Sequence, residues 1–168
     1  MLNENLVLIV EDNEDDVFML HHAFQKAGVI NPVQVESTGQ GAIAYLSGIE
    51  PYSDWNKFPL PAIVLLDLKL PGISGFDVLK FIRQHPGLKA LRVAMLTSSE
   101  LDQEIKMAYE LGANAFLTKP VDLNKLVEMM KVLHAHWVQH AQRPGISRLL
   151  PTKASSFCSP SAQATTPL

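Results

Sequence analysis

Two continuous apolar runs of strand length constrain the fold of this chain more than any other feature. They are Leu6–Val10 (LVLIV) and Ala62–Leu66 (AIVLL). Uninterrupted apolar strands rich in β-branched residues are typical of the centre of a parallel sheet that helices cover on both faces. Carboxylates follow each run directly, Glu11 and Asp12 after the first and Asp67 after the second. The runs therefore predict an α/β protein whose central strands end in acidic side chains.

Segments with the apolar spacing of amphipathic helices separate and follow these runs. Their apolar positions are Val17, Leu20, Phe24 and Ala27, then Val78, Leu79 and Ile82, then Leu101, Ile105 and Ala108, and finally Leu123, Leu126, Val127, Met130 and Leu133. Gly28 and Gly112 lie where two of these helices are expected to end. Further strands are predicted at Val33–Glu36, Leu91–Leu96 and Ala113–Thr118. Together these signals predict five consecutive strand–helix units.

The chain is long enough for one ordinary globular core, since 47% of its 168 residues are hydrophobic and 18% are charged. Residues 48–61 exceed the usual length of a connection and contain three prolines, so we interpret them as an inserted loop. We expect one domain over residues 1–142, followed by a flexible low-complexity tail over residues 143–168. Within that tail, Ile146–Leu150 is the one stretch with enough large apolar residues to dock on the domain.

Composition also excludes several classes of function. The formal net charge is -3 and the basic residues are scattered, so we expect no nucleic-acid partner. The single cysteine, Cys158, cannot close an intrachain disulfide, and no basic segment precedes the first apolar run, which predicts a cytoplasmic protein. No apolar stretch approaches the roughly 18 residues that a membrane span needs, so we expect no contact with the membrane interior.

The informative polar residues all follow predicted strands. Ligands of an open parallel sheet bind beyond the carboxyl ends of its strands, and Glu11, Asp12 and Asp67 would converge there. Three such carboxylates repel one another unless a cation lies between them, and an oxygen-only site suits Mg²⁺ better than Zn²⁺. Lys119 and Thr97 follow two other strands and would contact phosphoryl oxygens. The pattern predicts a phosphoryl site that acts by positioning and charge neutralisation.

Four short segments carry these residues. They are Val10–Asp16 (VEDNEDD), Leu66–Gly75 (LDLKLPGISG), Leu96–Ser99 (LTSS) and Gly112–Pro120 (GANAFLTKP). In this order they resemble the signature segments of the response-regulator receiver family. The resemblance implies a doubly wound, flavodoxin-like fold with five parallel strands in the order 2-1-3-4-5.

The resemblance also implies roles for individual residues around the acidic cluster. Asp67 would be the phosphoacceptor. Glu11, Asp12, Asp67 and the backbone carbonyl of Lys69 would hold Mg²⁺. Glu11 stands where the family often has aspartate, and we expect its longer arm to reach the ion through water. The side chain of Lys69 would add a cation near the phosphoryl group.

Further roles follow from the resemblance for the last two strands. Thr97 and Lys119 would contact the phosphoryl group, and Thr97 with Phe116 would form a switch pair. Without the resemblance, Phe116 is more simply a core residue. Pro120 would be structural, with a cis Lys119–Pro120 peptide bond.

At the level of function, the resemblance implies a single-domain response regulator of a two-component phosphorelay rather than an enzyme. Its partner would be a sensor histidine kinase. The inserted loop and the lack of an output domain are similar to small regulators that serve bacterial phytochrome-type kinases. A homodimer through the fourth helix, fifth strand and fifth helix is also expected, because Tyr109, Phe116 and Trp137 offer apolar contact area there.

Two other functions stay open at this point. A Mg²⁺-dependent phosphohydrolase also uses an aspartate at a strand end, but it usually has a second acid two residues later, and position 69 is lysine. An adaptor with receiver shape would not need the set Asp12, Asp67, Thr97 and Lys119. We interpret the acids Glu14–Asp16 as a solvated first turn of a helix.

Overall fold

The computed structural model describes residues 5–138, and these form one five-stranded parallel sheet with helices on both faces. The strand order is β2-β1-β3-β4-β5. The bounds are β1 Val7–Val10, β2 Val33–Glu36, β3 Ile63–Leu66, β4 Arg92–Thr97 and β5 Ala115–Thr118. The direction in which the sheet grows reverses between β1 and β3: β2 is added on one side of β1, and β3, β4 and β5 are added on the other. The predicted fold class and strand order are confirmed.

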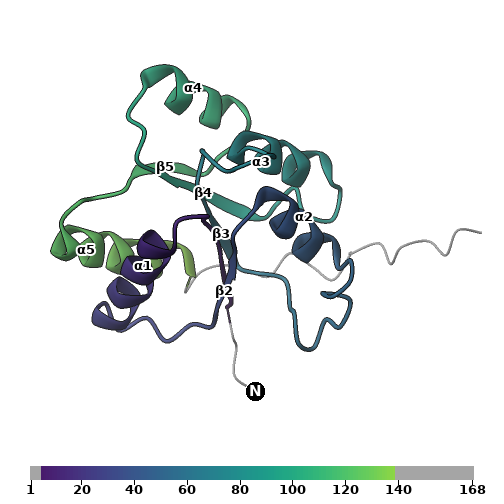
Figure 1. Cartoon of the computed structure of the whole chain (residues 1–168), viewed down its shortest axis with the longest axis horizontal. Coiled ribbons are helices and arrows are strands. Elements are labelled where there is room, and N and C mark those ends of the chain that lie inside the picture. Colours follow the sequence, from purple (N-terminus) through teal and green to yellow (C-terminus); the bar gives the residue numbers. More distant parts are fainter. Residues whose placement is uncertain (1–4, 139–168) are drawn as a thin grey trace, which may run out of the picture.

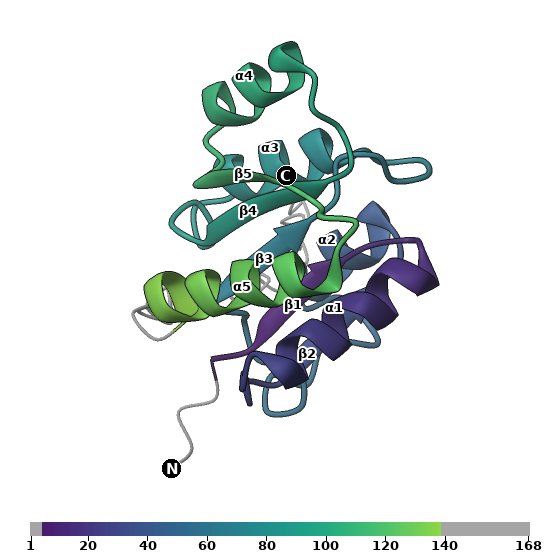
Figure 2. The same cartoon turned by 90° about the vertical axis from the view of Figure 1, so that its left-hand side faces the viewer.

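Five α-helices alternate with the strands, and a short π-helix extends the last one. Their bounds are α1 Glu14–Lys26, α2 Gly39–Ser47, α3 Gly75–Gln84, α4 Asp102–Glu110, α5 Leu123–Leu133 and η1 His134–Val138. Figure 1 shows α1 and α5 on one side of the sheet and α2 and α3 on the other. Figure 2 shows α5 lying across the front of the central strands, with β5 beyond it at the edge of the sheet.

The core consists of two apolar clusters, one on each face of the sheet. Alternate residues of a strand point to opposite faces, which divides the two central runs between the clusters. Leu8, Val10, Val64 and Leu66 face α2 and α3, while Val7, Ile9, Ile63 and Leu65 face α1 and α5. All eight side chains are buried. This two-sided burial explains why the runs show no polar alternation.

The start of α1 is fixed by its cap, which matters for the site. Asn13 is the N-cap residue, and its side-chain oxygen accepts hydrogen bonds from the backbone N–H groups of Asp15 at 2.9 Å and Asp16 at 3.1 Å. Such a cap satisfies donors that a helix leaves unpaired in its first turn. The helix therefore begins immediately after Glu11 and Asp12, and its first turn lies against the carboxyl ends of the strands.

A glycine allows α3 to begin close to the end of β3. The backbone N–H of Gly75 donates to the carbonyl of Leu68 at 2.9 Å. A Cβ atom on Gly75 would lie 2.1 Å from the carbonyl oxygen of Asp67, far inside van der Waals contact. The loop that carries Asp67 thus packs directly on the helix start.

Residues 48–61 contain turns but no helix or strand. Tyr52 and Phe58 pack edge-on against Tyr45 of α2, with ring centroids 5.2 and 6.2 Å away. The hydroxyl of Tyr45 donates to the carbonyl of Pro59 at 2.7 Å. These contacts hold the loop on the domain. Among the helices of residues 5–138, none has both the length and the apolar character needed to cross a membrane.

Candidate functional site

Three carboxylates meet at the carboxyl ends of β1 and β3. One oxygen each from Glu11, Asp12 and Asp67 lies within 4.8 Å of the other two. Glu11 and Asp67 are buried and Asp12 is exposed. This is the arrangement expected from strands that end at the same edge of the sheet. It offers hard oxygen ligands of the kind that Mg²⁺ and similar cations prefer.

The carboxylates line an open hollow of about 260 Å³. Its walls come from the ends of β1, β3, β4 and β5 and from the first turn of α1. The lining residues are Glu11, Asp12, Asn13, Asp16, Asp67, Lys69, Thr97, Ser98, Ser99 and Lys119. No histidine or cysteine is among them, so the donor set fits a hard cation and not Zn²⁺. All the residues predicted to bind metal or phosphoryl oxygens line this hollow.

Lys119 connects the acids of the hollow. Its ammonium group donates hydrogen bonds to Glu11, to Asp16 at 2.9 Å and to Asp67 at 3.2 Å. The side chain of Lys119 is only 12% exposed. Because an ammonium group has three donors, these carboxylates use all of them.

The charges of the cluster shift the pKa values of its members. Burial alone would lower the pKa of Lys119, but hydrogen bonds to Glu11 and Asp16 and the charge of Asp67 raise it above its usual range. The lysine is therefore positively charged at any physiological pH. Burial raises the pKa of Glu11, and the hydrogen bond from Lys119 opposes that rise. Four acids and two lysines, Lys69 and Lys119, line the hollow, so it carries excess negative charge that a bound cation would offset.

Asp16 belongs to the site although it was interpreted as part of a solvated turn. That interpretation holds for Glu14 and Asp15, which are exposed, and is wrong for Asp16, which is half-buried and contacts Lys119. Asp16 lies in the first turn of α1, which begins directly after the N-cap Asn13, and this turn faces the strand ends. The helix cap at Asn13 was the available signal for this placement.

Thr97 is the last residue of β4 and is 1% exposed. Its hydroxyl oxygen accepts a hydrogen bond from the backbone N–H of Ser99 at 3.3 Å. The hydroxyl hydrogen is therefore the group that can be donated to an oxygen in the hollow. In the β4–β5 register, Thr97 lies opposite Thr118.

Phe116 does not line the hollow. It is half-buried and packs against the apolar cluster on the α2 and α3 face. Its backbone N–H donates to the hydroxyl of Tyr109 at 3.2 Å, which ties β5 to α4. Tyr109 is 51% exposed, and the side chain of Trp137 lies outside the part of the chain that is described.

Lys69 and Pro120 flank the site. The backbone N–H of Lys69 points to an Asp67 oxygen 3.4 Å away, and the Lys69 residue is exposed at the mouth of the hollow. The prediction of a cis Lys119–Pro120 bond is wrong, because within residues 5–138 the cis peptide bond is Glu50–Pro51. The two isomers of an X–Pro bond differ by only about 0.5–1 kcal/mol, so a short motif does not determine which one forms. The Lys119–Pro120 peptide bond is trans, and the Lys119 side chain contacts the acids with the bond in this form.

The comparisons with known proteins agree with this geometry. The chain is 30% identical over 139 residues to the response regulator Rcp1 of Synechocystis, covering 83% of this chain and 92% of that protein. The crystal structure of the Mn²⁺-bound form of Rcp1 has a TM-score of 0.73 and covers 83% of this chain and 99% of its own.

Two further solved structures are similar. RPA3017, a response regulator in red light signalling of R. palustris, is 34% identical with a TM-score of 0.78, covering 83% of this chain and 97% of that chain. The phosphorylated cyanobacterial phytochrome response regulator RcpA is 30% identical with a TM-score of 0.76, covering 84% and 99%.

A family model described as the response regulator receiver domain matches residues 7–131. The matched region contains all five strands and the acidic strand ends that form the hollow. Because the match spans most of the chain, the chain belongs to the response regulator receiver domain family.

Proposed function

We propose that the protein is a single-domain response regulator that accepts a phosphoryl group on Asp67 from a histidine kinase. One observation carries the proposal. The buried carboxylate of Asp67 lies 3.2 Å from a lysine ammonium and close to two further acids, in a hollow that is open to solvent. A phosphoryl group that enters the hollow meets a nucleophile and a fixed positive charge at once.

In the proposed transfer, an Asp67 oxygen forms a bond to phosphorus while the bond from phosphorus to the kinase histidine nitrogen breaks. The nitrogen leaves with the electron pair. A Mg²⁺ ion bound by Glu11, Asp12, Asp67 and the carbonyl of Lys69 would supply positive charge to the phosphoryl oxygens. The chain itself supplies the nucleophile, the Lys119 charge and the Thr97 hydroxyl. This catalysis is positioning and charge stabilisation.

The hydrogen bonds of Lys119 explain how it would serve the phosphorylated state. Asp67 loses its charge when it becomes an acyl phosphate, so the donor now directed at Asp67 is free for a phosphoryl oxygen. Asp16 is outside the group of three acids that could hold a metal. It would therefore continue to hold Lys119 in place.

Signal output is proposed to begin at Thr97. A phosphoryl group brings about two negative charges and strong acceptors, toward which the Thr97 hydroxyl would turn. Phe116 lies on the neighbouring strand, and its backbone is bonded to Tyr109 of α4. A change at Phe116 would thus alter the surface of α4, β5 and α5, and we propose this surface as the contact for a partner or a homodimer.

The partner kinase is proposed to be of the phytochrome type. The support is the likeness to Rcp1, RPA3017 and RcpA, two of which are described by red light or phytochrome signalling. A cytoplasmic location would follow from such a partner.

Intact-mass measurement after incubation with acetyl phosphate and Mg²⁺ tests the function. The parent should gain one phosphoryl group, and Asp67→Asn should gain none. Asp102→Asn, an exposed acid at the start of α4, is the matched control and should behave like the parent. Rapid release of inorganic phosphate without a lasting gain would indicate a phosphohydrolase, and no reaction at all would indicate an adaptor.

Asp67→Asn should also leave the fold intact. The change is nearly isosteric and removes one of the four acids that line the hollow, so thermal stability without Mg²⁺ should equal or exceed that of the parent. A clear loss of stability would contradict the acidic-cluster interpretation.

A further inference from the structure

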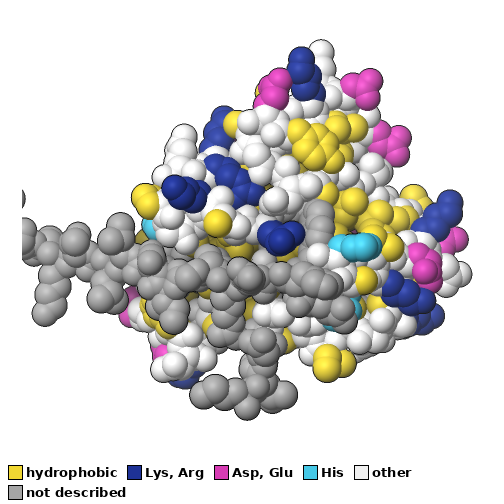
Figure 3. All heavy atoms as spheres, turned by 180° about the vertical axis from the view of Figure 1, so that it is seen from behind, with side chains coloured by type: hydrophobic (Ala, Val, Ile, Leu, Met, Phe, Trp, Pro, Cys, Tyr) yellow, Lys and Arg dark blue, Asp and Glu magenta, His cyan; other side chains and the backbone are white. Residues whose placement is uncertain are grey.

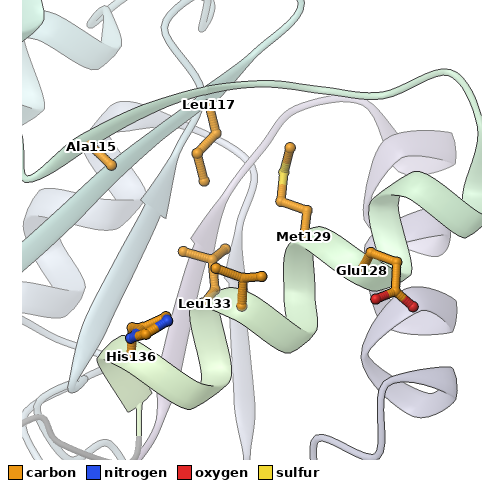
Figure 4. Close-up of a pocket in the computed structure, with 7 residues that line it drawn as sticks. Ala115, Leu117, Glu128, Met129, Leu133 and His136 are labelled. Atoms are coloured by element: carbon orange, nitrogen blue, oxygen red, sulfur yellow. The ribbon is translucent and has the colours of Figure 1, made fainter.

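A second hollow, of about 410 Å³, lies on the opposite side of β5 from Phe116. Its lining is almost entirely apolar. The residues are Ala115 and Leu117 of β5 together with Glu128, Met129, Val132, Leu133 and His136 of α5 and η1. Figure 4 shows Leu117 and Met129 pointing into the space from the strand and from the helix.

The hollow exists because two helices cover this face of five strands. α1 and α5 pack against each other, so β5 forms the outer margin of the face. Ala115 and Leu117 alternate along β5 and therefore both face α5. Val132, on the rim, is 58% exposed. Figure 3 shows hydrophobic side chains gathered beside histidine side chains on one face of the molecule.

The chain itself supplies an occupant. The described part of the chain stops at Val138 of η1, and His136 of the same π-helix lines the hollow. Residues 139–168 follow, and their largest apolar group is Ile146, Leu149 and Leu150. Their spacing of i, i+3 and i+4 places them on one face of a helical turn. We propose that residues 146–150 dock in this hollow in the same chain.

The linker is long enough for this docking. Residues 139–145 separate the π-helix from Ile146 and can span up to about 23 Å when extended. The hollow runs along the helix from Glu128 to His136, a rise of about 12 Å. Pro144 and Gly145 are typical of a chain reversal, which would return residue 146 toward β5.

Charge does not oppose the same segment. Glu128 lines the hollow, is exposed, and already pairs with Lys131 at 2.8 Å. Residues 146–150 contain one basic residue, Arg148, and no acid, so the segment brings no like charge to this carboxylate. The rest of the tail offers no comparable group of large apolar side chains beside a basic one.

A tethered segment also has an advantage over one from another molecule. A short flexible linker gives an effective concentration in the millimolar range, so even a weak contact of three side chains is populated. Under this proposal, residues 146–150 would belong to the folded domain, and the tail expected from the sequence would begin at residue 151. It does not depend on phosphorylation of Asp67.

Paramagnetic relaxation tests the proposal on the full chain. A nitroxide is attached to Ser147→Cys in a Cys158→Ser background, and ¹H–¹⁵N spectra are compared before and after reduction of the label. The amides of Ala115, Leu117, Met129 and Val132 should lose most of their intensity, and those of α3, across the sheet, should not. Leu149→Asp and Val132→Glu should each restore the signals. Phe157→Asp, the matched control in the tail, should not.

Mixed samples distinguish docking within one chain from docking between two copies of the chain. A ¹⁵N chain without a label is mixed with a spin-labelled chain without ¹⁵N. The proposal predicts no broadening in the mixture at any protein concentration. Broadening in the mixture, or none in the singly labelled chain whose spectrum shows a folded domain, would overturn it.

Discussion

The ammonium group of Lys119 donates a 2.9 Å hydrogen bond to Asp16, an acid outside the three-carboxylate group that fits a cation. Its other two acceptors, Glu11 and Asp67, belong to that group. A cation would therefore compete with Lys119 for Glu11 and Asp67, and phosphorylation would remove the carboxylate charge of Asp67. Asp16 is the partner that stays available throughout.

Replacing Asp16 should leave the Lys119 side chain less firmly held in position. We expect Asp16→Ala to cost about 0.5–1 kcal/mol in the free energy of unfolding, a modest value because its side chain is 39% exposed. Phosphorylation by acetyl phosphate should also slow. Urea denaturation and intact-mass time courses measure the two effects. Asp15→Ala removes the same charge one residue earlier and should change neither; equal effects in both variants would mean that charge alone matters.

Gly75 should tolerate no side chain. Gly75→Ala places a Cβ atom 2.1 Å from the Asp67 carbonyl oxygen, and the required backbone shift should cost about 1–3 kcal/mol. Because the shift moves Asp67, the affinity for Mg²⁺ should fall too. Gly28→Ala is the control, since that site has a φ of 72° and no atom within 4 Å of a new Cβ. It should lose stability without losing Mg²⁺ affinity in a titration.

The capping box of α3 should add a pH dependence to stability. The Ser74 side chain donates to Asp77 at 2.8 Å and its backbone N–H at 3.2 Å, which lowers the pKa of Asp77 below its usual value. The stabilisation is therefore present above the ordinary aspartate pKa of about 3.9 and is lost as pH falls through the lowered folded value.

Thermal melts of Asp77→Asn and the parent measure this dependence. The difference in Tm should be present at neutral pH and should shrink as pH falls below about 4. Ser74→Ala removes the hydroxyl donor but keeps the backbone N–H, so its pH-dependent part should be smaller, and the loss of the hydroxyl that accepts from the Asp77 N–H should remain at low pH. A difference that stays constant with pH would rule out the carboxylate as its source.

Thr97→Ala should separate phosphorylation from its consequence. The variant keeps Asp67, Lys119 and the acids, so it should still accept phosphate. It loses the hydroxyl that would turn toward the phosphoryl group, so any change in association that phosphate causes in the parent should disappear. Sedimentation of both proteins with and without acetyl phosphate measures this. Thr118→Ala, opposite Thr97 in the sheet, is the matched control.

Much of the fold was predictable from the sequence because the central strands are buried on both faces of the sheet. The runs at β1 and β3 could only be covered strands, and Glu11, Asp12 and Asp67 had to meet where those strands end. α2 was not predicted from its own pattern. A Cβ at Gly39 would lie 2.5 Å from the Ile73 carbonyl oxygen, so this helix start depends on a tertiary contact that local sequence does not reveal.

The site residues that follow strands were predictable, because the strand order decides where they lie. The site residue on a helix, Asp16, was not. Asp16 reaches Lys119 through the geometry of a capped helical turn, which charge pattern alone did not distinguish from the exposed Glu14 and Asp15. The isomer of the Lys119–Pro120 bond depends on a small energy difference that the motif does not fix.

The position of the phosphoryl group is the most direct test of the account. After acetyl phosphate and Mg²⁺, borohydride reduction converts an acyl phosphate of aspartate into homoserine, which peptide mass spectrometry locates. We expect homoserine at position 67 alone, and none when a chelator replaces Mg²⁺. Homoserine at position 12 or 16, or at no position while the protein remains folded, would contradict it.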